Sequence, residues 1–129
     1  MNLSKQYSSQ FTCRQVFEAW ISPSMIIPPA TKIEVEPIVG GKYHLYAESE
    51  SATFIMKGIF LEIVPNQKLM YTWQWEGTDE QTVVTVAFSE NPNGCTINLE
   101  HEGFVSDESI KNHSEGWDSY VSGLEERII

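Results

Sequence analysis

Two histidines are the side chains of this sequence whose spacing best suits chemistry. His113 lies four residues before Trp117 in the segment NHSEGWDSY, and residues four apart share one face of a helix. His101 follows Ile97 and Leu99 at intervals of two, so it shares the apolar face of a strand. Because an imidazole titrates near neutral pH, either side chain could move a proton or hydrogen-bond a ligand. A hydrogen-bonded core histidine is the alternative for both.

The spacing of residues predicts neither a nucleophile with its base nor a metal site. Ser114 adjoins His113, but neighbouring helix residues point about 100° apart, so this pair does not predict a nucleophile with its base. His101 and Glu102 point to opposite faces of a strand and cannot share one metal ion. No HExxH or CxxC motif is present. We therefore expect no metal and no cofactor.

The two cysteines, Cys13 and Cys95, are far apart in the sequence. This spacing fits neither a clustered metal site nor the disulfide framework of a small secreted domain, so we expect buried, reduced thiols.

The first ten residues, MNLSKQYSSQ, lack the apolar stretch of a secretion signal. We therefore expect a cytoplasmic protein.

The composition predicts one globular domain, residues 1–129. Of the 129 residues, 41% are hydrophobic and 20% are charged, which is typical of a soluble globular protein. No apolar run approaches the roughly 20 residues that span a bilayer, so membrane insertion is not expected. The formal net charge of -10 would repel phosphates, so nucleic acid is not expected as a partner.

Two short helices and one long helix are predicted. The first begins at Thr12, whose capping-box partner is Gln15, and Pro23 interrupts it. The prolines that follow leave room for one further helical turn at 24–27. The last helix begins after Ser106 and would be roughly 30 Å long. Its apolar stripe is formed by Ile110, His113, Trp117, Val121, Leu124 and Ile128.

About seven strands are predicted, at 3–9, 32–36, 43–47, 54–64, 69–75, 84–88 and 95–101. Their short connections favour an antiparallel meander. Alternation along the later strands gives one aromatic face and one polar face. In the strand at 54–64 the apolar phase slips, and we place a β-bulge at Lys57–Gly58 because a bulge there would bend the sheet.

The widths of these elements raise the question of a cavity. Seven strands about 4.8 Å apart form a sheet roughly 30 Å wide, whereas a helix covers about 10 to 12 Å. The sheet must therefore curl around the last helix. Space between helix and sheet would form a ligand pocket, or large side chains would fill it. Gly116 of the predicted helix also has two possible explanations. It lets a ligand approach the helix, or it lets the helix pack closely on a strand.

Several spaced motifs in residues 12–129 resemble one family: VFEAW, VGGKY, GIFLEIVPNQKLMYTW, GCTINLEHEG and HSEGWDSYVSGLEERI. They are similar to the START-like (SRPBCC) superfamily, in the branch of homologues of the activator of heat-shock-protein ATPase. The resemblance implies an α+β helix-grip fold, in which a curved antiparallel sheet grips a long C-terminal helix and two short helices follow the first strand. It also implies a deep cavity, which superfamily relatives use for lipids, polyketides or plant hormones.

The resemblance extends to individual positions. The matching residues are Gly40, Gly41, Trp73, His101, Gly103, His113, Gly116 and Trp117. The sequence departs from the pattern after the second expected helix, where Met25, Ile26, Ile27 and Pro28 replace the family's paired tryptophans. We therefore expect the mouth of the cavity to differ in shape and to be more aliphatic.

The leading functional prediction is a non-catalytic intracellular protein that binds a small apolar or aromatic ligand between sheet and helix. It rests on the aromatic inner face and on the absence of catalytic spacing. The two histidines would be polar anchors. The candidate ligand-binding residues are Trp20, Tyr43, Phe54, Met56, Tyr71, Trp73, Phe88, His101, His113, Trp117 and Tyr120.

Two alternatives remain open. One is a cyclase, dehydratase or hydrolase-like enzyme, in which the cavity orients the substrate and one histidine moves a proton. The other is a protein-interaction module, by analogy with chaperone-activating relatives. The sequence is compatible with either a monomer or a homodimer.

Overall fold

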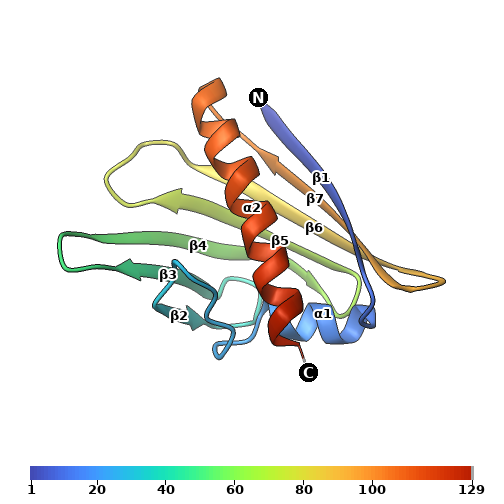
Figure 1. Cartoon of the computed structure of the whole chain (residues 1–129). Coiled ribbons are helices and arrows are strands. Elements are labelled where there is room, and N and C mark those ends of the chain that lie inside the picture. The colour runs from blue at the N-terminus through green and yellow to red at the C-terminus, as the bar shows by residue number, and fades with distance from the viewer. Residues whose placement is uncertain (129) are drawn as a thin grey trace.

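One antiparallel sheet of seven strands curves behind a long C-terminal helix in the computed structural model, which describes residues 1–128 (Figure 1). The strand order β1-β7-β6-β5-β4-β3-β2 confirms the predicted meander for β2 to β7, with β1 added beside β7. The elements are β1 (Asn2–Ser9), α1 (Cys13–Trp20), β2 (Lys32–Val35), β3 (Lys42–Glu48), β4 (Thr53–Val64), β5 (Lys68–Trp75), β6 (Thr82–Asn91), β7 (Gly94–Glu102) and α2 (Asp107–Arg127).

Only one short helix follows the first strand, so the prediction of two was wrong. Helix α1 has the expected capping box, in which the Thr12 hydroxyl accepts from the Gln15 N–H and the Gln15 side chain accepts from the Thr12 N–H. In place of the predicted second helix at 24–27 the chain makes a single turn, in which the Met25 N–H donates to the Ser22 carbonyl at 3.2 Å. Prolines on both sides restrict this segment and prevent a continuous helical ladder.

Helix α2 forms as the sequence predicts. Ser106 caps it by accepting from the Ser109 N–H at 3.1 Å, and acidic residues occupy its first turn. Its buried side includes Trp117, Val121 and Leu124, which confirms the centre of the predicted stripe. On the β1 side of the sheet, Asp118 accepts a hydrogen bond from Tyr7 and pairs with a lysine of the same strand.

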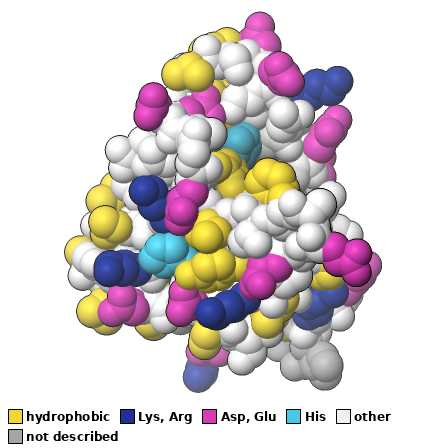
Figure 2. All heavy atoms as spheres, turned by 90° about the vertical axis from the view of Figure 1, so that its left-hand side faces the viewer, with side chains coloured by type: hydrophobic (Ala, Val, Ile, Leu, Met, Phe, Trp, Pro, Cys, Tyr) yellow, Lys and Arg dark blue, Asp and Glu magenta, His cyan; other side chains and the backbone are white. Residues whose placement is uncertain are grey.

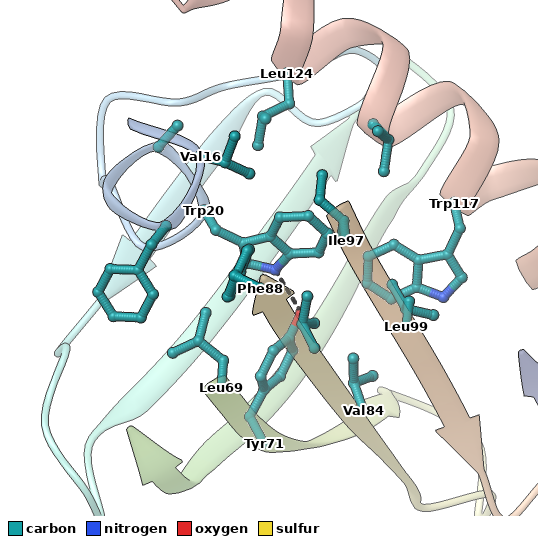
Figure 3. Close-up of a cluster of buried hydrophobic side chains, with 14 of the residues drawn as sticks. Val16, Trp20, Leu69, Tyr71, Val84, Phe88, Ile97, Leu99, Trp117 and Leu124 are labelled. Atoms are coloured by element: carbon teal, nitrogen blue, oxygen red, sulfur yellow. Dashed lines mark hydrogen bonds between the residues drawn. The ribbon is translucent and has the colours of Figure 1, made fainter. Parts of the chain in front are cut away.

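Large aromatic side chains fill the space between α1, α2 and the sheet. Trp20 stacks on Trp117 with ring centroids 6.0 Å apart, and its indole N–H donates to the Tyr71 hydroxyl at 3.1 Å (Figure 3). The inner faces of β5, β6 and β7 are buried as predicted. Full burial of each large apolar side chain contributes about 1.5 to 3 kcal/mol. In this part of the fold, side chains occupy the interior that could have been a cavity.

The predicted β-bulge was placed wrongly. Met56, Gly58 and Phe60 are all buried, so the inner phase of β4 is unbroken there, and the register shifts only between Phe60 and Glu62. Gly58 is instead a point of close approach, because a Cβ atom at this position would overlap the carbonyl oxygen of Thr72 on β5. The sequence pattern was misleading because large apolar side chains of β4, such as Ile59 at 47% exposure, face outward.

The expectation of reduced thiols was also wrong. Cys13 opens α1, Cys95 lies on the inner face of β7, and the two form a disulfide with Cα atoms 5.0 Å apart. Helix α1 packs on β6 and β7, which brings together residues that the sequence separates by 82 positions. Linear spacing could not show this contact, because the fold alone places α1 on the last strand.

Among the described residues, no helix is both long and apolar enough to cross a membrane.

Candidate functional site

A cleft of about 640 Å³ opens between α2, β3, the end of β5 and the loop at 25–30. This volume lies within the range of small-molecule sites. Seen from the side where the β3–β4 and β5–β6 loops project, hydrophobic side chains gather between charged groups (Figure 2). The lining residues are Met25, Ile27, Pro28, Pro29, Ala30, Leu45, Tyr46, Ala47, Trp73, Trp75, Asn112, His113, Glu115, Gly116, Trp117, Ser119 and Tyr120.

The position of the cleft follows from the widths of the helix and the sheet. Contacts of Asp118 with Tyr7 and Lys5 hold α2 toward β1. One helix is too narrow to cover the whole sheet, so the side that carries β3 is left uncovered. The cleft occupies this side instead of the centre of the grip, which aromatic rings fill.

The loop at 25–30 forms one wall of the cleft and packs against α2. Ile27 is buried at 6% exposure, and a Cβ atom on Gly123 of α2 would overlap its Cγ2 atom. Met25, Ile27 and Pro28 give this wall an aliphatic surface, whereas Ile26 is 40% exposed. Gly123 therefore lets the loop approach the helix closely.

Gly116 has the opposite role on the same helix. It lines the cleft, and a Cβ atom built on it would have no neighbour within 4 Å. Close packing of the helix on a strand therefore does not explain this glycine. Since glycine costs a helix interior about 1 kcal/mol relative to alanine, Gly116 keeps the cleft open at some expense in helix stability.

His113 lies at the inner end of the cleft and has both ring nitrogens occupied. Its Nε2 atom accepts hydrogen bonds from the indole N–H groups of Trp73 at 3.2 Å and Trp75 at 3.3 Å. Its Nδ1 atom lies 2.8 Å from the Ser109 carbonyl oxygen. An indole N–H can only donate and a carbonyl can only accept, so His113 is neutral and carries its proton on Nδ1.

His101 is fully buried beneath His113 and is the other tautomer. Its Nδ1 atom accepts from the Trp117 indole at 3.0 Å, so the proton lies on Nε2 and is donated to the Thr82 hydroxyl at 2.6 Å. That hydroxyl donates in turn to the Trp73 carbonyl at 2.9 Å. Burial lowers the pKa of His101 from 6.5 to about 3, so the ring is neutral near pH 7.

The two histidines and one tyrosine satisfy the indole N–H groups of all four tryptophans. A buried N–H without a partner costs about 1 to 3 kcal/mol. Such a dense cluster of tryptophans needs acceptors inside the core, and neutral imidazoles provide them. Both histidines were predicted to face inward, but their role as acceptors for the indoles was not predicted.

Four of the predicted ligand-binding residues line the cleft: Trp73, His113, Trp117 and Tyr120. Six others are buried in the core and do not line it: Trp20, Tyr43, Met56, Tyr71, Phe88 and His101. Phe54 is 62% exposed, because β4 continues past the end of β5, where no neighbouring element covers this side chain. The lining of the cleft therefore includes only part of the inner face of the sheet.

Several lining residues were missing from the predicted set. Trp75 alternates with Trp73 along the strand predicted at 69–75, and Leu45 and Ala47 alternate along the strand predicted at 43–47, so their direction was recognisable. Met25, Ile26, Ile27 and Pro28 were expected at the mouth of the cavity, and three of them, Met25, Ile27 and Pro28, belong to the lining. The contribution of Tyr46 had no signal in the sequence. The polar residues Asn112, Glu115 and Ser119 appear in the cleft only once the rotation of the helix is known.

The histidines offer the cleft no free imidazole nitrogen. His113 has no free ring nitrogen, and His101 is separated from the cleft by burial. Burial raises the pKa of Tyr120 well above its ordinary value, so its hydroxyl stays protonated. Within residues 1–128, no three His, Cys, Asp or Glu side chains gather as a metal site would require.

A seven-stranded antiparallel sheet closed on one long C-terminal helix is the helix-grip fold of the START-like (SRPBCC) superfamily. The family model described as Activator of Hsp90 ATPase homolog 1-like protein matches residues 10–128. The chain therefore belongs to this family, which confirms the resemblance seen in the sequence. No curated protein matches the chain.

Solved structures share the fold at low sequence identity. A crystal structure from Chromobacterium violaceum has a TM-score of 0.87 at 18% identity, and the match covers 98% of this chain and 96% of that one. One from Mesorhizobium loti has a TM-score of 0.84 at 20% identity, with 98% and 95% covered. An AHSA1-like protein from Aeromonas hydrophila has a TM-score of 0.78 at 20% identity, with 98% and 90% covered. At these identities the likeness concerns the fold alone.

Proposed function

We propose that this protein binds a small apolar or aromatic ligand in the cleft between α2, β3 and the loop at 25–30. The observation that carries the proposal is Gly116, a helix residue that faces open space within the cleft. A cleft of about 640 Å³ with aromatic and aliphatic walls suits such a ligand. In this proposal Trp73, Trp75 and Trp117 supply apolar contact area.

The hydrogen bonds of the histidines favour binding over catalysis. A general base needs a free nitrogen within reach of the substrate, and both nitrogens of His113 are engaged by Trp73, Trp75 and Ser109. An enzyme that uses His113 would first have to break these bonds. His113 therefore serves as a scaffold that fixes the two indole rings of the wall.

The decisive experiment fills the cleft from the helix side with Gly116→Leu. The leucine side chain extends into open space, so the variant is expected to be at least as stable as the parent, because leucine is the better helix former by about 0.5 to 1 kcal/mol. Binding of the neutral fluorophore phenylnaphthylamine, followed by fluorescence titration, is expected to weaken at least ~10-fold. Unfolding in urea reports stability in parallel.

Gly116→Ala is the matched control, because it makes the same change in helix propensity but adds only one methyl group. It is expected to gain stability and to retain most of the binding. Equal affinity of Gly116→Leu and the parent would contradict the proposal, as would no detectable binding by the parent.

A second candidate function is that of a protein-interaction module. The family description names an activator of an Hsp90 ATPase, and one side of the molecule exposes the large apolar side chains Ile38, Val39, Ile59 and Leu61. The ATPase rate of purified Hsp90, with and without this chain, tests this candidate. Stimulation that survives Gly116→Leu would assign the activity to a surface other than the cleft.

A further inference from the structure

The cleft contains one charged side chain, and it is acidic. Glu115 lies on α2 at the exposed rim, next to Gly116, and none of the described residues that line the cleft is a lysine or an arginine. The whole chain carries a formal net charge of -10. A ligand carboxylate would therefore find no cationic partner among the lining residues and would enter against the field of the protein.

The hydrogen-bond donors of the inner wall are already used within the protein. The Trp73 and Trp75 indoles donate to His113, and His113 donates to the Ser109 carbonyl. The Tyr46 hydroxyl donates to the Glu34 carboxylate. An anionic ligand needs such donors, and the lining residues that could still supply them, Asn112 and Ser119, are uncharged. The Glu115 carboxylate is an acceptor for a ligand that donates.

Aromatic rings complete an environment that suits a cation. Trp73, Trp75, Tyr46 and Tyr120 belong to the lining, and a cation within about 6 Å of an aromatic face is attracted to it. Lys32 already makes such a contact, with its Nζ atom 5.0 Å from the centre of the Tyr46 ring. A ligand cation would avoid this lysine and lie nearer to Glu115.

We infer that the cleft selects apolar ligands that carry a protonated amine and discriminates against apolar carboxylates. The ammonium group lies at the rim near Glu115, and the apolar body lies against the indoles and the aliphatic loop. This inference rests on the proposed binding function and adds the ligand class.

Three probes with the same aromatic body and different charge test the inference: naphthylmethylamine, naphthylmethanol and naphthoic acid. Each is titrated against the protein at neutral pH and low salt, with displacement of phenylnaphthylamine as the readout. The amine is expected to bind about fivefold more tightly than the alcohol, and the acid is expected to bind most weakly. Added salt is expected to reduce the preference for the amine, because Glu115 is exposed.

Glu115→Gln locates the preference within the cleft. It is expected to reduce the affinity for the amine about fivefold and to leave the affinity for the alcohol unchanged. Glu102→Gln is the matched control: it makes the same change in net charge at an exposed residue of β7 outside the cleft, and it is expected to leave all three affinities unchanged.

The outcomes separate this inference from the proposed function. If the alcohol binds and the acid binds as tightly as the amine, the inference is overturned and the binding function stands. If neither phenylnaphthylamine nor any of the three probes binds, both fail. An amine preference that is equal in the parent and in Glu115→Gln would also overturn the inference, because the preference would then arise from the net charge alone.

Discussion

His113 accepts two hydrogen bonds through a single ring nitrogen, and this arrangement fixes two walls of the cleft at once. The Trp73 and Trp75 side chains lie on the same face of β5, two residues apart. Their indole N–H groups converge on His113 of α2. One imidazole therefore ties the helix to the end of the strand at the point where the cleft begins.

Loss of this shared acceptor should destabilise the fold. His113→Leu removes the partner of both indoles, and we expect the free energy of unfolding to fall by about 2 to 3 kcal/mol, since each orphaned donor costs about 1 to 3 kcal/mol and partial exposure lowers that cost. His113→Gln offers a carbonyl oxygen as a replacement acceptor and should lose less. Urea unfolding measures both variants, and equal losses would show that the hydrogen bonds contribute little.

His101 should make stability depend on pH. Its pKa is about 3 in the folded chain, because burial disfavours the charged ring, and 6.5 in the ordinary state. Below pH 6.5 the unfolded chain binds a proton that the folded chain does not bind. The free energy of unfolding is therefore unaffected by protonation of His101 above this pH. As the pH falls toward 3, it decreases by about 1.4 kcal/mol per pH unit.

Urea unfolding at several pH values from about 7 down to 4.5 tests this prediction, with His101→Asn as the variant. Asparagine keeps an acceptor for the Trp117 indole but does not titrate. The free energy of unfolding of this variant should therefore lose most of the decrease of about 1.4 kcal/mol per pH unit. Staying above pH 4.5 limits interference from carboxyl groups such as Glu80, whose pKa is lowered by its bonds to Ser109 and Val105. An unchanged slope in the variant would contradict the assignment.

At the scale of elements, the disulfide joins α1 to the strand that it covers. Cys13 and Cys95 close a loop across 82 positions, and cross-linking a loop of this length reduces the entropy of the unfolded chain. The expected contribution to the free energy of unfolding is about 4 kcal/mol. Replacing both cysteines by alanine should therefore lower the urea midpoint strongly while the sheet and α2 still form.

A chemical measurement checks the same bond in the parent protein. Under denaturing conditions without reductant, a thiol-alkylating reagent should modify neither cysteine, and after reduction it should modify both. Alkylation before reduction would show that the thiols are free in the purified protein. In that case, replacing both cysteines by alanine should lower the free energy of unfolding by less than the loss of a disulfide would.

The two glycines of α2 show how one helix serves two purposes. At Gly123 the absent side chain lets Ile27 pack on the helix, which places the loop at 25–30. At Gly116, about two turns earlier, the absent side chain leaves open space in the cleft. The first glycine builds a wall of the cleft, and the second leaves room between the walls.

At the scale of the whole molecule, the fold divides the space between helix and sheet into a filled part and an open part. On the β1 side, Tyr7 and Lys5 hold α2 through Asp118, and aromatic rings fill the centre of the grip. On the β3 side, the sheet extends beyond the width of the helix. The cleft is therefore a consequence of the mismatch in width between one helix and seven strands.

Local patterns of residues were enough to predict the strands, the long helix and the polarity of their faces. Turn residues and period-two alternation located β5, β6 and β7, and the capping residues Thr12 and Ser106 marked the helix starts. These features are local, since they depend on residues within a few positions of one another. The family resemblance then supplied the way in which the elements assemble.

Features that depend on contacts between distant residues became visible only in the folded chain. The tertiary structure paired Cys13 with Cys95, moved the irregularity of β4 from Gly58 to the residues after Phe60, and left Phe54 exposed beyond the end of β5. It also placed the open space beside Gly116 and not among the core aromatics. The physical reason is common to all four: each depends on which side chains from remote segments meet, and local patterns contain no record of those contacts.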